Sequence, residues 1–375
     1  MPSPTPIMKH AALLLSLVAV GLLDCRVHAG TPIEGKAEVD GKAAPTEARR
    51  TWFPDDPAGL ITLGGQFSDD LSGAYFDSIL GLWSPQSRNA FLFSNSRYHW
   101  EDNDQFISST GLGFRVKCPD HDMIFGVNAY WDSLHSEAGN DFSQLGLGAE
   151  ILTRWVDARF NYYLPEDERY EIGRRTERDD SRSVGPEFVN GRFVARDVRE
   201  TSRRQSFRSY EAALEGYNAE VGFLIPGLDR YAEVRVFAGY YHYDNPFGSD
   251  FEGFKARLEA RPLPGVMLDV EYWDDAALMG GHWTAGARVS VPFSLVKLVT
   301  GHNPFEGIGD SFKVRQRDFS ERMSEMVIRS HRVQTTSSGD IPSGTSTSTK
   351  VTTVPVRLRT AADDVLPRRS GLLIE

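Results

Sequence analysis

Apolar and polar residues alternate along most of this chain, from about residue 59 to residue 293. The clearest stretch places apolar residues on one face and charged residues on the other: Phe254, Ala256, Leu258 and Ala260 against Lys255, Arg257, Glu259 and Arg261. Residues 156–164 and 283–293 repeat the pattern. A period of two residues indicates β-strands with one apolar and one polar face. We therefore expect an all-β fold.

Turn residues divide the alternating region into about twelve segments, an even number, as single-chain outer-membrane barrels require. The expected strands begin near Gly59, Gly73, Asn89, Gln105, Asp122, Phe142, Trp155, Tyr210, Tyr231, Phe251, Val266 and His282. Their length of ~10 residues is what a tilted membrane strand needs, whereas soluble strands average about 5–6 residues. The pattern predicts a transmembrane antiparallel up-and-down β-barrel, followed by a short helical or linker segment.

The strand ends and connections agree with a membrane barrel. Tyrosine and tryptophan residues gather near expected strand ends, as in the aromatic girdles of such barrels: Trp83, Trp100, Trp131, Tyr163, Tyr243, Trp273 and Trp283. Short turns alternate with longer, more acidic loops, and long loops lie outside the cell. Both ends of the barrel should then face the periplasm. The longest connection, residues 164–209, has few apolar residues; this predicts disorder, with a functional loop as the alternative.

The N-terminus has the features of a secretory signal. Lys9 and His10 precede an apolar run over residues 11–23, which is shorter than the ~20 residues that span a bilayer. Val27-His28-Ala29 follows and fits a signal-peptidase site. We expect cleavage after Ala29.

The chain has two cysteines, Cys25 and Cys118. Cleavage after Ala29 would remove Cys25 and leave Cys118 alone, so that no internal disulfide could form. A lipid anchor on Cys25 is the alternative, but Asp24 stands where lipoprotein signals need a small residue.

The chain after the barrel has a different character. Residues 310–334 show a broken helical pattern, are amphipathic and carry several arginines. We expect this segment to enter the barrel, pair with acidic wall residues and occlude the pore. Residues 335–353 are rich in Ser and Thr, which predicts an unfolded tail, exposed on the cell surface or left in the periplasm. The expected organisation is a signal peptide (1–29), a polar periplasmic linker (30–58), the barrel (59–293), a post-barrel linker or pore plug (294–334) and a disordered tail (335–375).

The polar face of the expected strands carries charges of both signs: Arg115, Glu150, Asp157, Arg159, Glu220, Glu233, Arg235, Lys255, Arg257, Glu259, Arg261, Asp269, Glu271 and Arg288. They could line a solute-selective pore or form a salt-bridged lumen that holds the barrel rigid. The mixture of positive and negative residues favours the second interpretation, because selective pores are usually lined by rings of charged side chains of a single sign. Phe293 ends the last strand and is similar to the terminal aromatic signal that barrel-insertion machinery recognises.

Composition argues against several other classes of function. The net charge is −11, and binding of nucleic-acid phosphates needs a basic face. The sequence has no metal-binding cysteine pair, H-E-x-x-H or Walker motif, so we expect no cofactor or metal. An outer-membrane hydrolase would need a histidine beside Ser or Asp near the outer rim. The residues expected there are His135, His242, His282, Asp244 and Asp275. A histidine near acidic loop residues is more typical of plain surface than of a general base, so we expect that the protein is not an enzyme.

Several strands, in order, resemble the inverse autotransporter β-domain of intimins and invasins. The matching stretches are Gly111-Leu112-Gly113-Phe114-Arg115, Gly126-Val127-Asn128-Ala129-Tyr130-Trp131-Asp132, Leu145-Gly146-Leu147-Gly148-Ala149-Glu150, Asn161-Tyr162-Tyr163-Leu164-Pro165, Gly216-Tyr217-Asn218-Ala219-Glu220, Ala256-Arg257-Leu258-Glu259 with Pro262, and Val291-Pro292-Phe293. Each motif is weak alone, but their order across residues 59–293 is specific. Residues 322–333 look like the segment that follows the barrel in that family.

The resemblance implies a twelve-stranded outer-membrane barrel whose chain turns back through the pore and carries a C-terminal passenger outside. It also implies outer-membrane lipid, the barrel-assembly machinery and periplasmic chaperones as partners. The chain departs from the family at both ends: no room for a peptidoglycan-binding module precedes Gly59, and no immunoglobulin-like repeats follow Phe293. We expect a translocation or anchoring barrel rather than an adhesin, with a stand-alone porin-like channel as the alternative.

Overall fold

The structure, a computed structural model, describes residues 58–355 apart from 69–71, 86, 119–121, 167–168, 191, 229–230 and 276–279. The expected signal peptide, almost all of the expected linker and the last twenty residues of the tail (356–375) lie outside the described residues. The chain divides into two compact units. The first comprises Met1–Tyr170 and Ala212–Thr336, and the second comprises Glu171–Glu211 and Ser337–Glu375.

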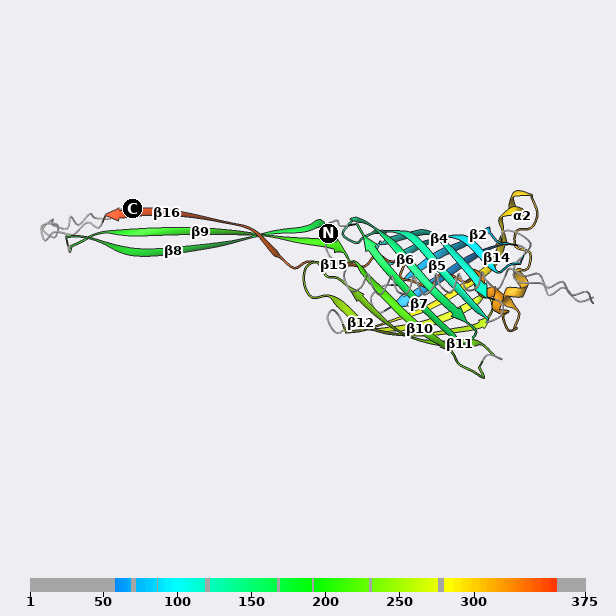
Figure 1. Cartoon of the computed structure of the whole chain (residues 1–375). Coiled ribbons are helices and arrows are strands. Elements are labelled where there is room, and N and C mark those ends of the chain that lie inside the picture. Colours follow the sequence, from blue (N-terminus) through cyan, green and yellow to red (C-terminus); the bar gives the residue numbers. More distant parts are fainter. Residues whose placement is uncertain are drawn as a thin grey trace, which may run out of the picture. The chain divides into compact units, whose positions relative to one another are not determined.

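Twelve antiparallel strands of the first unit close into a barrel (Figure 1), which confirms the predicted fold class. They are β1 (Ala58–Ser68), β2 (Gly73–Trp83), β3 (Ala90–Glu101), β4 (Phe106–Cys118), β5 (Met123–His135), β6 (Asp141–Thr153), β7 (Val156–Pro165), β10 (Gly216–Leu224), β11 (Glu233–Tyr243), β12 (Phe251–Leu263), β13 (Val266–Asp275) and β14 (Gly280–Ser294). Each pairs with its sequence neighbour, except that β7 pairs with β10.

The barrel closes where β1 pairs with β14, and Phe293 stands opposite Gly59 at this seam. A Cβ atom on Gly59 would lie 2.5 Å from the ring of Phe293. Only glycine therefore leaves room for the aromatic residue that ends the barrel sequence. One expected strand start was wrong: Tyr210 lies in the long strand β9 (Arg192–Ala213), and the barrel resumes six residues later at Gly216.

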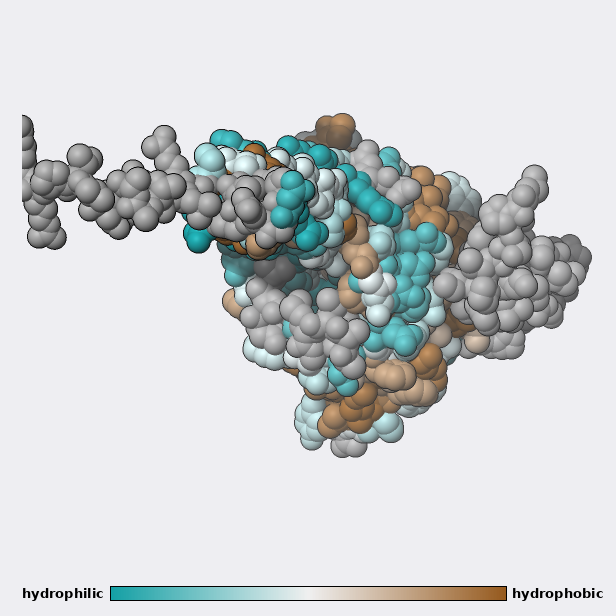
Figure 2. Space-filling model, turned by 90° about the vertical axis from the view of Figure 1, so that its left-hand side faces the viewer, coloured by the Kyte–Doolittle hydropathy of each residue, from teal (hydrophilic) through white to brown (hydrophobic). Residues whose placement is uncertain are grey.

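Alternation along strands such as β12 separates an outer apolar face from an inner polar face. In β12, Leu258 is 45% exposed, whereas its neighbours Arg257 and Glu259 are 5% and 4% exposed. Figure 2 shows apolar side chains gathered in patches on the outside of the barrel. An apolar outer band around a polar interior is the arrangement of a lipid-facing barrel.

The aromatic residues divide between the two faces. Trp83, Trp100, Trp131 and Trp283 are about half exposed, as expected for a girdle. The other three predicted girdle residues instead lie inside, where Tyr163 and Tyr243 are buried and Trp273 packs against their cluster. The physical reason is strand parity. Tyr163, for example, shares its face of β7 with Asp157 and Arg159, so it points inward.

In the described residues after β14, the helical structure is limited to three short turns: α2 (Leu295–Val299), η2 (Ile308–Phe312) and η3 (Phe319–Ser324). The helical pattern over residues 310–334 was therefore mostly misleading. A capping box between Asp318 and Glu321 starts η3, but residues 325–355 are not helical. No helix in the described ranges is long and apolar enough to cross a membrane.

The second unit is a sheet that the sequence analysis predicted neither for the connection over residues 164–209 nor for the tail. The connection expected to be disordered forms β8 (Arg169–Val189) and β9, which pair with each other. The tail contributes β15 (Thr335–Ser337) and β16 (Ile341–Pro355), both paired with β9. The disorder prediction is thus wrong for these residues. A strand ladder satisfies backbone groups without a hydrophobic core, so low apolar content did not prevent pairing here.

Cys118 at the end of β4 is disulfide-bonded. The expectation that no internal disulfide can form concerns the chain after cleavage at Ala29, and it stays a prediction.

Candidate functional site

The C-terminal chain crosses the barrel lumen over residues 317–334, which we call the lumen segment. At the end of the barrel with the short turns, Lys117 Nζ donates to Ser320 Oγ at 2.6 Å and Arg317 Nη2 donates to Glu233 at 2.7 Å. At the opposite end, Arg332 donates to Glu101 at 2.8 Å, beside the loop between β3 and β4. The segment therefore runs from the short-turn end to the loop end.

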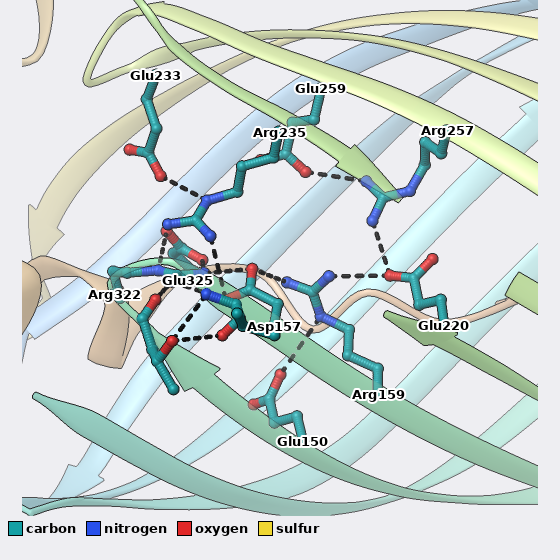
Figure 3. Close-up of polar contacts among 12 residues, drawn as sticks. Glu150, Asp157, Arg159, Glu220, Glu233, Arg235, Arg257, Glu259, Arg322 and Glu325 are labelled. Atoms are coloured by element: carbon teal, nitrogen blue, oxygen red, sulfur yellow. Dashed lines mark hydrogen bonds and ion pairs between the residues drawn. The ribbon is translucent and has the colours of Figure 1, made fainter. Parts of the chain in front are cut away.

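The strongest concentration of charge surrounds Asp157 of β7, whose side chain is fully buried. Arg322 of the lumen segment donates to both of its carboxylate oxygens, at 2.9 and 2.8 Å. Arg235 and Arg159 of the wall approach the same carboxylate at 3.3 and 3.5 Å. Figure 3 shows these guanidinium groups converging on Asp157. Arg322 also donates to the Thr153 carbonyl at 2.6 Å, which ties the segment to the turn end of β6.

Arg115 of β4 holds the backbone of the lumen segment. Its Nε donates to Glu150 at 2.6 Å, while its Nη1 donates to the carbonyls of Met323 and Glu325 at 3.0 and 2.5 Å. These two carbonyls accept hydrogen bonds from the wall at the point where η3 ends. The contact accounts for the end of the helix: wall side chains satisfy backbone groups that a longer helix would bond internally.

A second buried ion pair lies deeper in the lumen. Arg329 donates to both oxygens of Asp132 at 2.7 and 2.6 Å, and both side chains are 0% exposed. The guanidinium lies 4.5 Å from the ring centroid of Tyr130. Gly146 on the adjoining strand β6 makes room, because a Cβ atom there would clash with Arg329 Nη2. The bidentate geometry fixes position as well as charge.

The other side of the lumen segment packs against an apolar wall. Met323, Met326 and Val327 form one buried cluster with inward residues of β1, β2, β3, β5 and β6: Leu60, Tyr75, Ile79, Phe91, Phe93, Ile124, Tyr130 and Leu152. Nearer the loop end, Val333 packs with Ile107, Leu134 and Phe142. The lumen thus has a charged side and an apolar side. The arginines of the lumen segment pair with the first, and its methionine and valine residues pack against the second.

The charged residues singled out in the sequence lie at buried or half-buried positions of the barrel. Many form a network within the wall itself. Glu220 accepts from Arg159 at 2.9 Å and from Arg257 at 2.7 Å, and Glu259 accepts from Arg257 and Arg261, each at 2.9 Å. Positive and negative groups alternate through this network (Figure 3), which favours the salt-bridged interpretation over a ring of one sign.

Some residues that hold the lumen segment were missed by the sequence analysis. Asp132 and Glu101 pair with its arginines, and Asp77 pairs with Arg97 at 3.0 Å within the wall. A signal was present for Asp132: it shares strand parity with Asn128 and Tyr130, which also point into the barrel. Its partner Arg329 lies 197 residues away in sequence, a separation that no local pattern reveals.

A cavity of about 490 Å³ opens at the short-turn end of the barrel. Its lining includes Arg154, Arg235, Arg261, Glu233 and Arg317. Arg322 also lines this cavity, so the turn-side mouth is wide and polar, whereas residues 323–327 beyond it are buried against the wall.

Two histidines of the rim, His135 and His242, pair with acids. His135 Nδ1 lies 2.7 Å from Asp141 and His242 Nε2 lies 3.0 Å from Asp244, and among the described residues neither ring contacts a serine hydroxyl. His242, Asp244 and Asp250 also place ligand atoms within 4.8 Å of one another. This exposed acidic group is the part of the described chain that could hold a cation, and nothing further points to one.

Comparisons with known proteins agree with this architecture. The family model described as "Inverse autotransporter, beta-domain" matches residues 49–283, and no curated protein matches the sequence. A membrane-protein structure from a study of in-meso crystallization has 12% sequence identity and a TM-score of 0.51, covering 75% of this chain and 99% of that one. At this identity it supports the fold alone.

Two further solved structures are more distant. The Acinetobacter baumannii outer membrane protein Omp33 has 12% identity and a TM-score of 0.32, covering 62% of this chain and 97% of its own. The translocator domain of the autotransporter NalP from Neisseria meningitidis has 11% identity and a TM-score of 0.25, covering 73% of this chain and 96% of its own. The family match spans more than half of the sequence and falls on the strands that build the barrel. The chain therefore belongs to the inverse autotransporter β-domain family and is an outer-membrane barrel of the translocation and anchoring type.

Proposed function

We propose that this barrel carries its own C-terminal chain through the lumen to the outer face of the outer membrane and anchors it there. The supporting observation is the direction of the lumen segment, which begins at the short-turn end near Lys117 and Glu233 and leaves at the loop end near Glu101. In outer-membrane barrels the short turns face the periplasm and the long loops face outward.

Anchoring follows from how the segment is held. Arg322 and Arg329 each make a bidentate pair with a fully buried wall carboxylate, Asp157 and Asp132. Breaking such a pair by moving one partner leaves an uncompensated buried charge, which costs about 3–5 kcal/mol. A chain pinned at both positions cannot slide along the lumen without breaking both pairs together. The barrel is thus the membrane anchor for whatever follows residue 334.

The route to the membrane is part of the proposal. Residues 1–29 act as a cleaved signal peptide, and the barrel is delivered by periplasmic chaperones and inserted by the barrel-assembly machinery. The protein is a translocator without catalytic activity. The family match and the composition of the N-terminus support these steps.

An epitope tag placed after Glu375 tests the direction of export. Antibody binding to the tag on intact cells is the expected result. A tag that antibody reaches only after the outer membrane is permeabilised would overturn export and leave a plain barrel with a periplasmic tail.

Single-channel conductance tests whether the segment closes the pore. The full chain should conduct much less than a chain that ends after Phe293, because the latter lacks the residues that pack against the wall. Equal conductance of the two would contradict occlusion and favour a porin-like channel.

A further inference from the structure

Strand β9 of the second unit has tail residues along one of its edges. The other edge pairs with β8. On the tail side the register runs antiparallel from Ile341 opposite Arg208 to Pro355 opposite Ala195, with one irregularity between Pro342 and Gly344. Every residue of β16 is exposed. Among the described strands its ladder is made with β9 alone, so β9 is what keeps this part of the tail ordered.

The two partners of β9 differ in how they can reach it. β8 and β9 are consecutive in sequence and form a hairpin through local contacts. Thr201 and Thr349, which face each other across β9 and β16, are 148 residues apart. Local pairings form before distant ones, because loop closure costs less entropy. The hairpin can therefore be complete while the tail is still arriving, and its free edge is a template for an added strand.

Contacts near the two ends of β16 set its register. A strand of repeated Ser and Thr specifies register weakly. Just before β16, Asp340 accepts from Ser209 at 3.1 Å and pairs with Arg175 of β8, also at 3.1 Å. Toward the other end, Lys350 is the only charged residue of β16 and stands opposite Glu200. These charges fit one alignment of the tail, which distinguishes docking of this sequence from generic edge pairing.

We infer that the β8–β9 hairpin is a receptor for the translocated tail: the edge of β9 captures residues 341–355 by strand addition as they leave the barrel. This inference rests on the proposed function. Tail residues that have paired with β9 can no longer slide back into the barrel. Pairing of each newly emerged residue therefore favours movement of the chain outward. The connection between β7 and β10 is then a working part of export, and its partner is this chain's own Ser/Thr-rich tail.

Paired cysteines in the full-length chain test the capture directly. Thr201→Cys with Thr349→Cys places two thiols at facing positions whose hydroxyls now lie 3.4 Å apart. The matched control, Thr201→Cys with Ser348→Cys, puts the thiols on opposite faces of the ribbon, because side chains alternate along a strand. Intact cells are treated with a membrane-impermeant oxidant, and the parent chain under the same treatment gives the baseline for Cys118.

Capture predicts an intramolecular disulfide, seen as faster migration in a non-reducing denaturing gel, in the facing pair and not in the control. Absence of the cross-link in the facing pair, or equal cross-linking in both pairs, would overturn capture. The tag after Glu375 separates the two proposals: a tag accessible on intact cells without the cross-link removes capture and leaves export standing. An inaccessible tag without the cross-link removes both.

A charge swap in the cysteine-pair background tests the register. Lys350→Glu faces Glu200 with a like charge and should slow cross-linking about twofold to fivefold, the scale of a cross-strand charge pair. Adding Glu200→Lys should restore much of the rate, because opposite charges face each other again. A double variant as slow as the single one would contradict the assigned register.

Discussion

Two parts of the same C-terminal chain are held in opposite ways. The lumen segment is buried and fixed by side chains, through Arg322 with Asp157 and Arg329 with Asp132. Strand β16 is exposed throughout and is fixed by a backbone ladder with β9. Side-chain pairs in a dry interior are specific and costly to break, whereas a polar ladder tolerates many sequences. The segment inside the barrel can therefore act as a fixed anchor, and the part beyond it can vary in sequence except at Asp340 and Lys350, which set its register.

The largest expected effect comes from removing one member of a buried pair. Asp132→Ala leaves the fully buried guanidinium of Arg329 without its carboxylate and should destabilise the barrel by about 3–5 kcal/mol. Denaturant titration followed by heat-modifiable gel migration measures this loss. As a control, Arg329→Met combined with Asp132→Ala should recover much of it, because no buried charge remains. A single variant as stable as the parent would show that the pair does not hold the segment.

The lipid-facing surface should respond to charge in a similar range. Leu258 is 45% exposed on the outside of β12, so Leu258→Arg should cost about 2–4 kcal/mol if it lies near the bilayer midplane and should impair assembly. Leu258→Phe keeps the position apolar and serves as the control. The amount of heat-modifiable protein in outer membranes is the readout. Equal amounts for both variants would argue that this face does not contact lipid.

A steric change at Gly146 should have a smaller effect and should act on the lumen segment. Gly146→Val places methyl groups where Arg329 now lies, at a cost of about 1–3 kcal/mol for overpacking. The displaced guanidinium should also loosen the plug and raise single-channel conductance. Leu145→Val, one residue away on the outer face, should change neither quantity. Conductance of Gly146→Val at the parent level would count against a tight fit here.

The smallest effect belongs to the second unit. Lys350→Ala removes the only charge of β16 and should leave the denaturation midpoint of the barrel unchanged within about 0.5 kcal/mol, as for most surface substitutions. The same titration used for Asp132→Ala provides the measurement. A loss comparable to that of Asp132→Ala would abolish the contrast between the two parts of the chain.

The sequence predicts the barrel well because each strand carries its own signal. Alternation places the starts of β2, β12 and β13 at Gly73, Phe251 and Val266, as observed, and it assigns Leu258 and Glu259 to opposite faces. These properties depend on neighbours one or two residues away. The presence of an aromatic residue near a strand end does not by itself predict a girdle position. Tyr163 lies near the end of β7, but its parity along the strand directs it inward.

The rest depends on contacts between distant residues. The pair of Asp132 with Arg329 and the ladder of β16 on β9 join positions more than a hundred residues apart. The charged connection between β7 and β10 has the composition of a disordered loop, and its order comes from pairing that satisfies the backbone rather than from burial. Helical periodicity after the barrel failed for a related reason: wall side chains such as Arg115 compete for the carbonyls of the segment.

The central claim is that the chain crosses the barrel from the periplasmic mouth to the outer face, and single cysteines on either side of the lumen segment test it most directly. Lys313→Cys lies before the segment at an exposed position and Gly339→Cys lies after it, also exposed. With a membrane-impermeant maleimide, Gly339→Cys should be labelled on intact cells, and Lys313→Cys only after the outer membrane is permeabilised. Labelling of both cysteines from the same side of the membrane would contradict the account.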